Sequence, residues 1–189
     1  MKVVNIIGSP RSRGNSAGIA QLLLEQPGLA DSLVRSYELN RLTYRGCQGC
    51  MACKTKLEKC VVQDDLTYVL EDIRTADVVI FSSPVYFGEV TAQAAGLIHR
   101  GYSFLGNDYR TNPKPSRLAP GKKLVLILSQ GNKDENVFAE LVPRYTRIFG
   151  RLGFEEVQVV RGLGLGPESD PRKQEDILKR VKAVAEKLV

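Results

Sequence analysis

Short apolar runs alternate along the chain with longer segments in which apolar residues recur with the period of a helix. The short runs are rich in Val, Ile and Leu, the composition of strands in a buried sheet. The pattern predicts strands at residues 2–7, 32–39, 77–83, 122–130 and 154–160.

The segments between these strands have the spacing of amphipathic helices. Asp64 and Asp65 suit the positive end of a helix dipole, and Asp170 followed by Pro171 suits an N-cap and first turn. Pro143 predicts an irregularity within the fourth helix. We predict helices at residues 16–26, 64–76, 91–104, 136–152 and 170–189.

Strands that alternate with helices form parallel sheets covered by helices on both faces. The pattern therefore predicts an α/β fold with right-handed crossovers. Ligands in such folds bind at the carboxyl ends of the strands, near the point where the strand order reverses. A functional site is accordingly expected in the loops that follow the strands. A long connection at about residues 40–63 is a further candidate segment.

The composition narrows the class of protein. The chain has 189 residues, enough for one domain, and we expect residues 1–189 to form one. Its net charge of +6 is spread along the chain without a nucleic-acid-binding signature, so no nucleic-acid partner is expected. The N-terminal apolar run is too short for a signal peptide or membrane span, and the cysteines do not form a secreted disulfide framework. These features predict a cytoplasmic protein without membrane attachment.

The loop GSPRSRGNS, residues 8–16, has the composition of an anion site. Gly8 and Gly14 permit tight turns, Ser9 and Ser16 are small donors, and Arg11 adds positive charge. The N-terminus of the following helix offers free N–H groups. Because the Walker and dinucleotide glycine patterns are absent from the loop, it predicts a phosphate site of another kind. An ordinary polar turn is the alternative.

Two further loops complete a predicted pocket. SSPVYFGEV, residues 82–90, places Tyr86 and Phe87 where two rings would wall a flat ligand, and Gly88 permits close approach of the backbone. SQGNKDE, residues 129–135, would form a third wall. Together the loops suit a mononucleotide with a flat ring. The alternative is that both aromatic residues fill the core.

All four cysteines lie in the segment CQGCMACKTKLEKC. The spacing Cys-x2-Cys-x2-Cys-x6-Cys suits a 4Fe–4S cluster held by Cys47, Cys50, Cys53 and Cys60. Thiols without metal, a structural zinc site and a local disulfide are the alternatives. Nearby basic residues would favour an anionic cluster or guide an acidic carrier such as ferredoxin. They are Arg45, Lys54, Lys56 and Lys59.

Three of these motifs resemble one known family. GSPRSRGNS, CQGCMACKTKLEKCVVQDD and SSPVYFGEVTAQ are similar to segments of the flavodoxin-like NAD(P)H-dependent FMN reductase superfamily, and most of all of its iron–sulfur flavoprotein branch. The distinctive part covers roughly the first half of the chain. The resemblance implies a flavodoxin-like three-layer sandwich, a five-stranded parallel sheet in order 2-1-3-4-5, a bound FMN and NAD(P)H as co-substrate.

The resemblance also assigns residues to the cofactor. The phosphate would be held by Ser9, Arg11, Gly14, Asn15 and Ser16. The isoalloxazine ring would be flanked by Pro84, Val85, Tyr86, Phe87 and Gly88, with Ser129, Gln130 and Gly131 in the third loop. No catalytic side chain is implied, because FMN carries the chemistry. A homodimer or homotetramer is implied, with the cysteine segment near a neighbouring subunit's flavin.

The sequence thus predicts an FMN-dependent oxidoreductase. Electrons would pass from NAD(P)H or a reduced carrier to a small acceptor such as a flavin or quinone, with a 4Fe–4S cluster linking the flavin to one-electron partners. One rival is a non-enzymatic electron carrier of the flavodoxin type. Such carriers tend to be acidic and to stack tryptophan on the flavin, whereas this chain has a charge of +6 and no Trp. A cofactor-free binding domain on the same fold is a second rival.

Overall fold

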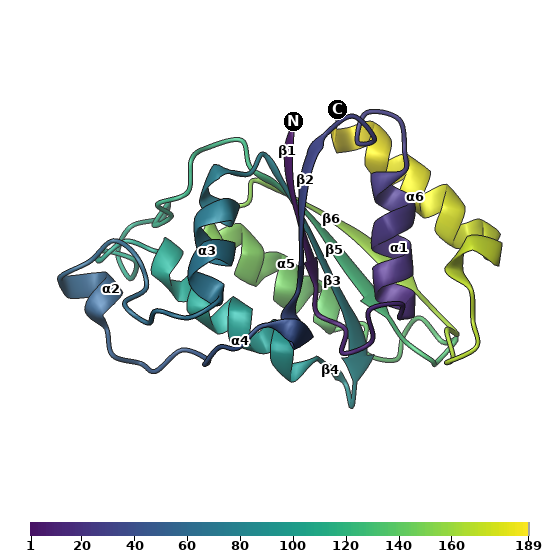
Figure 1. The fold of residues 1–189 in the computed structure, drawn as a ribbon, viewed down its shortest axis with the longest axis horizontal. Coiled ribbons are helices and arrows are strands. Elements are labelled where there is room, and N and C mark those ends of the chain that lie inside the picture. Colours follow the sequence, from purple (N-terminus) through teal and green to yellow (C-terminus); the bar gives the residue numbers. More distant parts are fainter. Residues whose placement is uncertain (189) are drawn as a thin grey trace.

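A twisted sheet runs through the middle of the protein in the computed structural model, which describes residues 1–188 (Figure 1). Its strands are β1 (Lys2–Ile7), β2 (Leu33–Glu38), β3 (Val78–Tyr86), β4 (Glu89–Val90), β5 (Lys123–Ser129) and β6 (Glu156–Gly162). The parallel strands lie in the order β2-β1-β3-β5-β6, which confirms the predicted flavodoxin-like order. The short β4 pairs with β3 in antiparallel fashion and is an addition to the predicted five strands.

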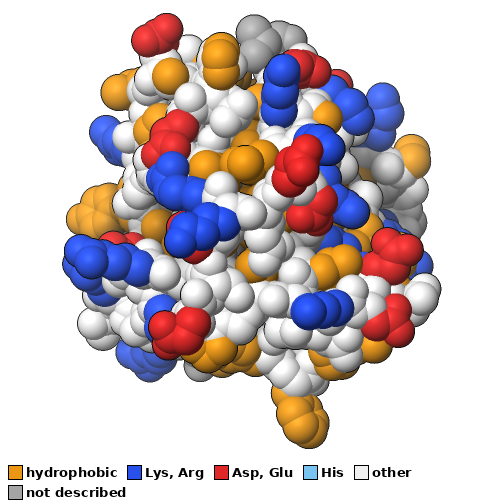
Figure 2. Space-filling model, turned by 90° about the vertical axis from the view of Figure 1, so that its right-hand side faces the viewer, with side chains coloured by type: hydrophobic (Ala, Val, Ile, Leu, Met, Phe, Trp, Pro, Cys, Tyr) orange, Lys and Arg blue, Asp and Glu red, His pale blue; other side chains and the backbone are white. Residues whose placement is uncertain are grey.

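Helices cover both faces of the sheet. On one face lie α1 (Asn15–Leu24) and α6 (Glu175–Leu188), and on the other lie α3 (Leu66–Thr75), α4 (Ala92–Arg100) and α5 (Leu141–Leu152) (Figure 1). The view onto the first of these faces shows positive and negative side chains interspersed at the surface (Figure 2). Among residues 1–188, no helix has both the length and the apolar character needed to cross a bilayer.

Alternate residues of the strands point into two separate cores. In β5, Leu124, Leu126 and Leu128 belong to the core beneath α3, α4 and α5. Val125 and Ile127 belong to the core beneath α1 and α6. Burial on both faces explains why this strand is an uninterrupted apolar run.

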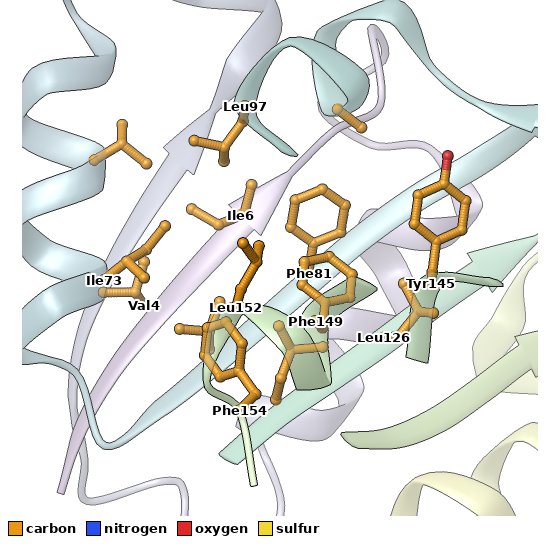
Figure 3. Packing of buried hydrophobic residues seen from close by; sticks show 14 of the residues in the cluster. Val4, Ile6, Ile73, Phe81, Leu97, Leu126, Tyr145, Phe149, Leu152 and Phe154 are labelled. Carbon is orange, nitrogen blue, oxygen red and sulfur yellow. The ribbon is translucent and has the colours of Figure 1, made fainter. Parts of the chain in front are cut away.

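Aromatic rings hold α5 against the sheet. The ring centroid of Phe149 lies 5.2 Å from that of Phe81 in β3 and 6.1 Å from that of Phe154 (Figure 3). Leu126 and Leu152 lie beside these rings in the same core. Because α5 follows the third predicted loop in the chain, this packing anchors the far end of that loop.

The fourth helix is shorter than the pattern predicted. A helix was expected from residue 136, but α5 begins at Leu141, because Phe138 has a left-handed backbone with φ of 62°. Pro143 therefore lies in the first turn of α5, where a missing N–H costs no helical hydrogen bond. The predicted irregularity inside the helix was wrong for this reason.

The last helix also begins later than predicted. Asp170 caps a 3-10 turn, Pro171–Lys173, by accepting a hydrogen bond from the N–H of Arg172 at 3.0 Å, and α6 begins at Glu175. The helix expected over residues 91–104 ends at Arg100 and continues as a 3-10 turn, Gly101–Phe104. Residue 189, the predicted end of the last helix, lies outside the described residues.

Candidate functional site

The three predicted loops follow three neighbouring strands at one edge of the sheet. Ile7, which ends β1, is paired in register with Ser82 of β3, and Pro84 of β3 is paired with Ser129, which ends β5. The strand order reverses at β1, since β2 lies on one side of it and β3 on the other. The loops therefore meet at the topological switch point, where sheets of this kind bind ligands.

The first loop closes tightly against β3. The N–H of Gly8 donates to the carbonyl of Ser82 at 2.7 Å, and the carbonyl of Gly8 accepts from the Thr91 hydroxyl at 2.6 Å. A Cβ at position 8 would lie 2.8 Å from the same Ser82 oxygen. At Gly14, a Cβ would lie 2.8 Å from the Ser9 hydroxyl oxygen. Both glycines are therefore needed for space, and they allow a narrow loop in front of α1.

Ser16 has an unsatisfied hydroxyl at the start of α1. Its side chain is buried, with 1% of the residue exposed, and its hydroxyl has no hydrogen-bond partner among residues 1–188. A buried polar group without a partner costs about 1–3 kcal/mol. The first turn of a helix also carries unpaired N–H groups and the positive end of the dipole. This combination fits an anionic group that accepts hydrogen bonds from the loop.

The other residues of the first loop differ in what their side chains contact. Ser9 is buried, and its hydroxyl accepts from the N–H of Arg11 at 3.0 Å. Asn15 donates from Nδ2 to the carbonyl of Gly166 at 2.8 Å, which ties the loop to the segment after β6. The Arg11 side chain is exposed. Arg11 and Ser16 can therefore serve an anion directly, whereas the Asn15 amide is engaged by the protein.

The second loop is the tip of a β-hairpin, which the sequence pattern missed. β3 continues beyond the expected strand end at Ser83 to Tyr86, because its last two residues pair with β4. Phe87 and Gly88 form the two-residue turn, with φ of 53° and 79°. Positive φ at both positions is typical of a type I′ turn. For a residue as bulky as Phe87 this backbone is strained, and such strain gathers at functional sites.

The aromatic side chains of the hairpin lie on the surface. Tyr86 is 44% exposed and Phe87 is fully exposed, which excludes the alternative that they fill the core. Figure 2 shows a hydrophobic group projecting from the lower end of the molecule, where Figure 1 places the β3–β4 hairpin. Pro84 is buried and Val85 is half-buried in the strand. Two exposed rings at this edge are available to a ligand or to another chain.

The third loop is organised around the side chain of Gln130. Its Oε1 accepts a hydrogen bond from Arg161 at 2.8 Å. Its Nε2 lies within 3.3 Å of three carbonyl oxygens, those of Asn132, Asp134 and Val137. Gln130 thus supports the loop from inside, with 5% of the residue exposed. Ser129 is buried as well, whereas Gly131 is exposed at the loop surface.

Ser83 and Thr91 connect the first two loops, although neither was among the predicted site residues. The Ser83 hydroxyl accepts from the N–H of Thr91 at 3.1 Å. The Thr91 side chain caps α4 by accepting from the N–H of Ala94 at 3.2 Å. A threonine before a helical segment is a capping signal, so the role of Thr91 was detectable in the sequence. The role of Ser83 depends on the hairpin and was not.

A groove runs from this edge of the sheet toward the cysteine segment. It has a volume of about 590 Å³ and lies between the turn after β2 and α4. Asn40, Tyr44, Gln93 and His99 line it, together with Gly46, which immediately precedes the first cysteine. The groove therefore joins the surroundings of the two predicted sites.

The four cysteines line one hollow beside the 3-10 turn that follows α4. Their segment bends around it through the short helix α2 (Ala52–Thr55), and Gly49 and Met51 have left-handed backbones with φ of 63° and 58°. All four cysteines are free thiols, with Cys47 and Cys50 exposed. Thiol side chains from both ends of a long segment therefore face a common space.

The four thiols border the hollow without converging on one point. Within the described chain, no three His, Cys, Asp or Glu side chains converge closely enough to hold one metal ion. Thiolates of a zinc site would each lie about 2.3 Å from the metal. Four thiols around a hollow of about 60 Å³ supply the ligand set of a 4Fe–4S cluster, and they equally suit reduced thiols without metal.

Arg100 fastens both ends of the cysteine segment. Its side chain is fully buried at the end of α4. Nη1 donates to the carbonyl of Arg45, and Nη2 donates to the carbonyl of Val62, both at 2.9 Å. Nη1 also pairs with the Asp64 carboxylate at 2.8 Å. Burial lowers the pKa of the Arg100 guanidinium, but Asp64 and Cys60 raise it more, so the pKa lies above its usual value.

Lys54 and Arg117 hold the middle of the same segment. Lys54 is 8% exposed, so it is not part of the solvated basic surface, whereas Arg45, Lys56 and Lys59 are exposed. Its Nζ lies 4.0 Å from the ring centroid of Tyr102 and donates to backbone carbonyls. Arg117 donates to the carbonyl of Cys53 at 2.9 Å. Burial lowers the pKa of Lys54, while the nearby Cys53 thiol opposes that shift.

The N-terminal two thirds of the chain match a family of known proteins. The sequence model described as "NADPH-dependent FMN reductase" matches residues 1–132. This segment contains all the residues that the sequence analysis assigned to the cofactor, and the four cysteines.

Curated relatives carry two kinds of name. An iron–sulfur flavoprotein of Methanocaldococcus jannaschii is 37% identical over 105 residues, which are 53% of this chain and 51% of that protein. An FMN-dependent NADH:quinone oxidoreductase of Rhizobium meliloti is 31% identical over 125 residues, 62% of this chain and 59% of that protein. The chain spans about half the length of the curated relatives it matches.

Solved structures share the whole fold at low identity. The NAD(P)H:quinone oxidoreductase from Methanothermobacter marburgensis has a TM-score of 0.75 and 18% identity, and the match covers 100% of this chain and 96% of the other. An FMN-dependent NADH-azoreductase from Bacillus anthracis, solved in complex with FMN, has a TM-score of 0.72 and 14% identity over 100% and 99% of the two chains. At these identities the likeness shows the fold alone.

Proposed function

Because the chain belongs to the family of NADPH-dependent FMN reductases, we propose that it binds FMN across the carboxyl ends of β1, β3 and β5 and transfers electrons from NAD(P)H to a small acceptor such as a flavin or quinone. The observation that carries this proposal is the buried Ser16 hydroxyl, which has no partner within residues 1–188 and lies at the helix end facing the three loops. Bound FMN supplies the hydride and electron chemistry of its ring.

The residues of the first loop bind and orient the phosphate in this proposal. Ser16 donates its free hydroxyl, Arg11 supplies a positive charge, and Ser9 and Asn15 shape the loop through their own hydrogen bonds. Gly14 keeps the backbone N–H groups accessible, because a side chain there would strike Ser9. Charge and directed donors together provide more than the roughly 0.3–2 kcal/mol of a helix end alone.

The second and third loops enclose the ring in this proposal. Tyr86 and Phe87 offer exposed aromatic surface at the tip of the hairpin. Gly88 packs against the ring of Phe138, since a Cβ at Gly88 would lie 3.0 Å from it. This contact joins the hairpin to the segment after the third loop. The buried Gln130 keeps the third loop in shape, so the backbone at Ser129 and Gly131 is the part that meets the ring.

We propose that Cys47, Cys50, Cys53 and Cys60 hold a 4Fe–4S cluster. The support is that all four line one hollow, with the number and sequence spacing of ligands that suit such a cluster. Such a cluster supplies one-electron transfer when bound. α4 joins the two sites, since Thr91 caps it at the flavin edge and Arg100 ends it at the hollow. With a rise of 1.5 Å per residue, these ends are about 14 Å apart.

The proposed partners follow from the same surfaces. A second copy of the chain, in a homodimer or homotetramer, would cover the projecting hairpin with its fully exposed Phe87. The exposed Arg45, Lys56 and Lys59 beside the hollow suit an acidic electron carrier such as ferredoxin. Residues 1–189 act as one FMN-binding domain in this proposal.

Purified protein loaded with FMN should oxidise NADPH or NADH when a quinone or free flavin is supplied. The family's chemistry requires this turnover, and it separates an enzyme from a flavodoxin-type carrier. The assay follows the absorbance of the nicotinamide under anaerobic conditions, with FMN-free protein as the control. A protein that binds FMN but oxidises neither nucleotide would favour the carrier.

Protein purified without oxygen should contain about four iron and four sulfide atoms per chain if the cysteines hold the cluster. Metal and acid-labile sulfide analysis measures this directly. Cys50→Ser should lose the iron and sulfide while it retains FMN, because the two sites lie at opposite ends of α4. Wild-type protein that remains iron-free after reconstitution with iron and sulfide would contradict the cluster and leave the reductase proposal standing.

A further inference from the structure

Two side chains that line the cysteine hollow carry polar atoms without partners. Arg100 and Ser103 both border it. Among residues 1–188, neither Nε of Arg100 nor Oγ of Ser103 has a hydrogen-bond partner, although both atoms are fully buried. Buried unpartnered donors are rare in folded proteins, and each demands an explanation.

The structural role of Arg100 explains its other nitrogens but not Nε. Nη1 donates to Arg45 and Asp64, and Nη2 donates to Val62. These bonds fasten the two ends of the cysteine segment. The Nε–H takes part in none of these bonds among residues 1–188. A lysine at this position would have no corresponding N–H group.

The Ser103 hydroxyl makes no hydrogen bond among residues 1–188, although it lies in a turn. Ser103 lies in the 3-10 turn Gly101–Phe104, where a serine hydroxyl commonly bonds a carbonyl one turn earlier. It makes no such bond here. The Ser103 backbone carbonyl lies 3.4 Å from guanidinium nitrogens of Arg74 and Arg117, so the residue is held in place from outside the hollow.

Positive charge is also concentrated around the hollow. Arg100 is fully buried and Lys54 is 8% exposed, and both are bound mainly to backbone carbonyls. Asp64 is the one carboxylate in an ion pair with either of them within the described residues. Arg100 and Ser103 border the hollow, and Lys54 lies behind it against the ring of Tyr102. An anionic group held by the cysteines would therefore lie near an excess of positive charge and close to two buried donors that have no partner among residues 1–188.

We propose that the Arg100 Nε–H and the Ser103 hydroxyl donate hydrogen bonds to sulfur atoms of the group held by the four cysteines, and that they raise its reduction potential. This rests on the proposed 4Fe–4S cluster. Reduction adds one electron to that group and so makes it more negative by one charge. Hydrogen bonds from donors grow stronger as the acceptor becomes more negative, so they stabilise the reduced form more than the oxidised form. Both residues are positioning residues in this sense, since neither transfers the electron.

The test is a redox titration of reconstituted protein carrying Ser103→Ala. This change removes only the hydroxyl and leaves the bonds of the backbone carbonyl intact. We expect the equilibrium constant for one-electron reduction of the cluster to fall about tenfold, a shift of about 59 mV to lower potential. Iron and sulfide content and the melting temperature should stay at wild-type values.

Two further variants separate tuning from general damage. Thr55→Ala removes a hydroxyl from the same segment, one that bonds the Met51 carbonyl at 3.4 Å and does not line the hollow, so its potential should match wild type. Ser103→Thr keeps the hydroxyl, so its reduction potential should stay close to that of wild type. Arg100→Lys should also lower the potential; if it does not fold, Ser103→Ala decides the proposal.

The outcomes are distinguishable. A Ser103→Ala cluster with normal iron content and wild-type potential overturns the tuning role and leaves the cluster itself in place. Wild-type protein without iron and sulfide overturns both, while turnover of NAD(P)H with FMN is measured independently. A lower potential in Ser103→Ala, with Thr55→Ala unchanged, supports the proposal.

Discussion

Asp64→Ala is expected to lower the free energy of unfolding by about 3–5 kcal/mol. The Asp64 carboxylate pairs with the Arg100 guanidinium at 2.8 Å, and the Arg100 side chain is 0% exposed. Without the carboxylate, a buried positive charge keeps only backbone carbonyls and the neighbouring Cys60 thiol beside it among the described residues. Asp64 also accepts hydrogen bonds from the N–H groups of Arg45 and Leu66, so the variant loses the ordered end of the cysteine segment as well. Urea unfolding followed by circular dichroism measures the loss.

Asp65→Ala is the matched control. Asp65 is the exposed neighbouring residue, and its carboxylate accepts from the N–H of Thr43 at 2.6 Å without an ion pair in the described residues. We expect a loss of about 1 kcal/mol there. Equal losses in the two variants would contradict the role given to the buried pair.

The same carboxylate predicts the direction of a pH effect. Burial raises the pKa of Asp64, but hydrogen bonds from Arg100 and the Arg45 N–H lower it more, so its pKa in the folded protein lies below the ordinary value. Its contribution to stability is therefore full above about pH 4, the unfolded value, and is lost as the pH falls through the lower folded value. The difference between wild type and Asp64→Ala should shrink over that acidic range.

Ser16→Asp is expected to weaken FMN binding roughly 100-fold, or about 2.7 kcal/mol. The substitution replaces a buried donor with a negative charge at the proposed phosphate position. Quenching of flavin fluorescence during titration of FMN-free protein gives the Kd. Riboflavin, which lacks the phosphate, should bind wild type and variant with similar Kd values.

Gln21→Glu provides the control for charge. It adds one negative charge to the exposed face of α1, away from the first turn of that helix. Its FMN affinity should stay near that of wild type, and the melting temperatures of both variants show whether the fold is intact. Wild-type FMN affinity in Ser16→Asp would remove Ser16 from the phosphate site.

The sequence by itself determined the alternation of strands and helices, the parallel sheet and the edge at which the loops gather. These follow from local periodicity, because a strand buried on both faces must be apolar throughout, as β5 is. The phosphate site proposed in the first loop could also be predicted from local sequence, because glycines, small donors and a helix N-terminus follow one another directly in the chain. A shared site for the four cysteines could be predicted for the same reason, since all four lie in one short segment.

Only the tertiary structure decided which side chains support those segments. The hairpin of β3 and β4 depends on pairing across a turn in which Phe87 adopts a left-handed backbone, a conformation that no propensity favours. The side chain of Gln130 lies inside the third loop, where three carbonyls and Arg161 surround it, and no local pattern predicts that placement.

The role of Arg100 could not be predicted from local sequence, because it depends on contacts with residues far away in the chain. It ends a helix 36 residues after Asp64, in a stretch of sequence that looks like any other amphipathic helix. The fold places Arg100 beside the cysteine segment, where its buried charge pairs with Asp64. Its Nε–H has no partner there among residues 1–188. The sequence determined that four thiols lie close together in the chain. The packing of α4 decided that they share a hollow with a buried guanidinium and with a serine hydroxyl that has no partner among residues 1–188.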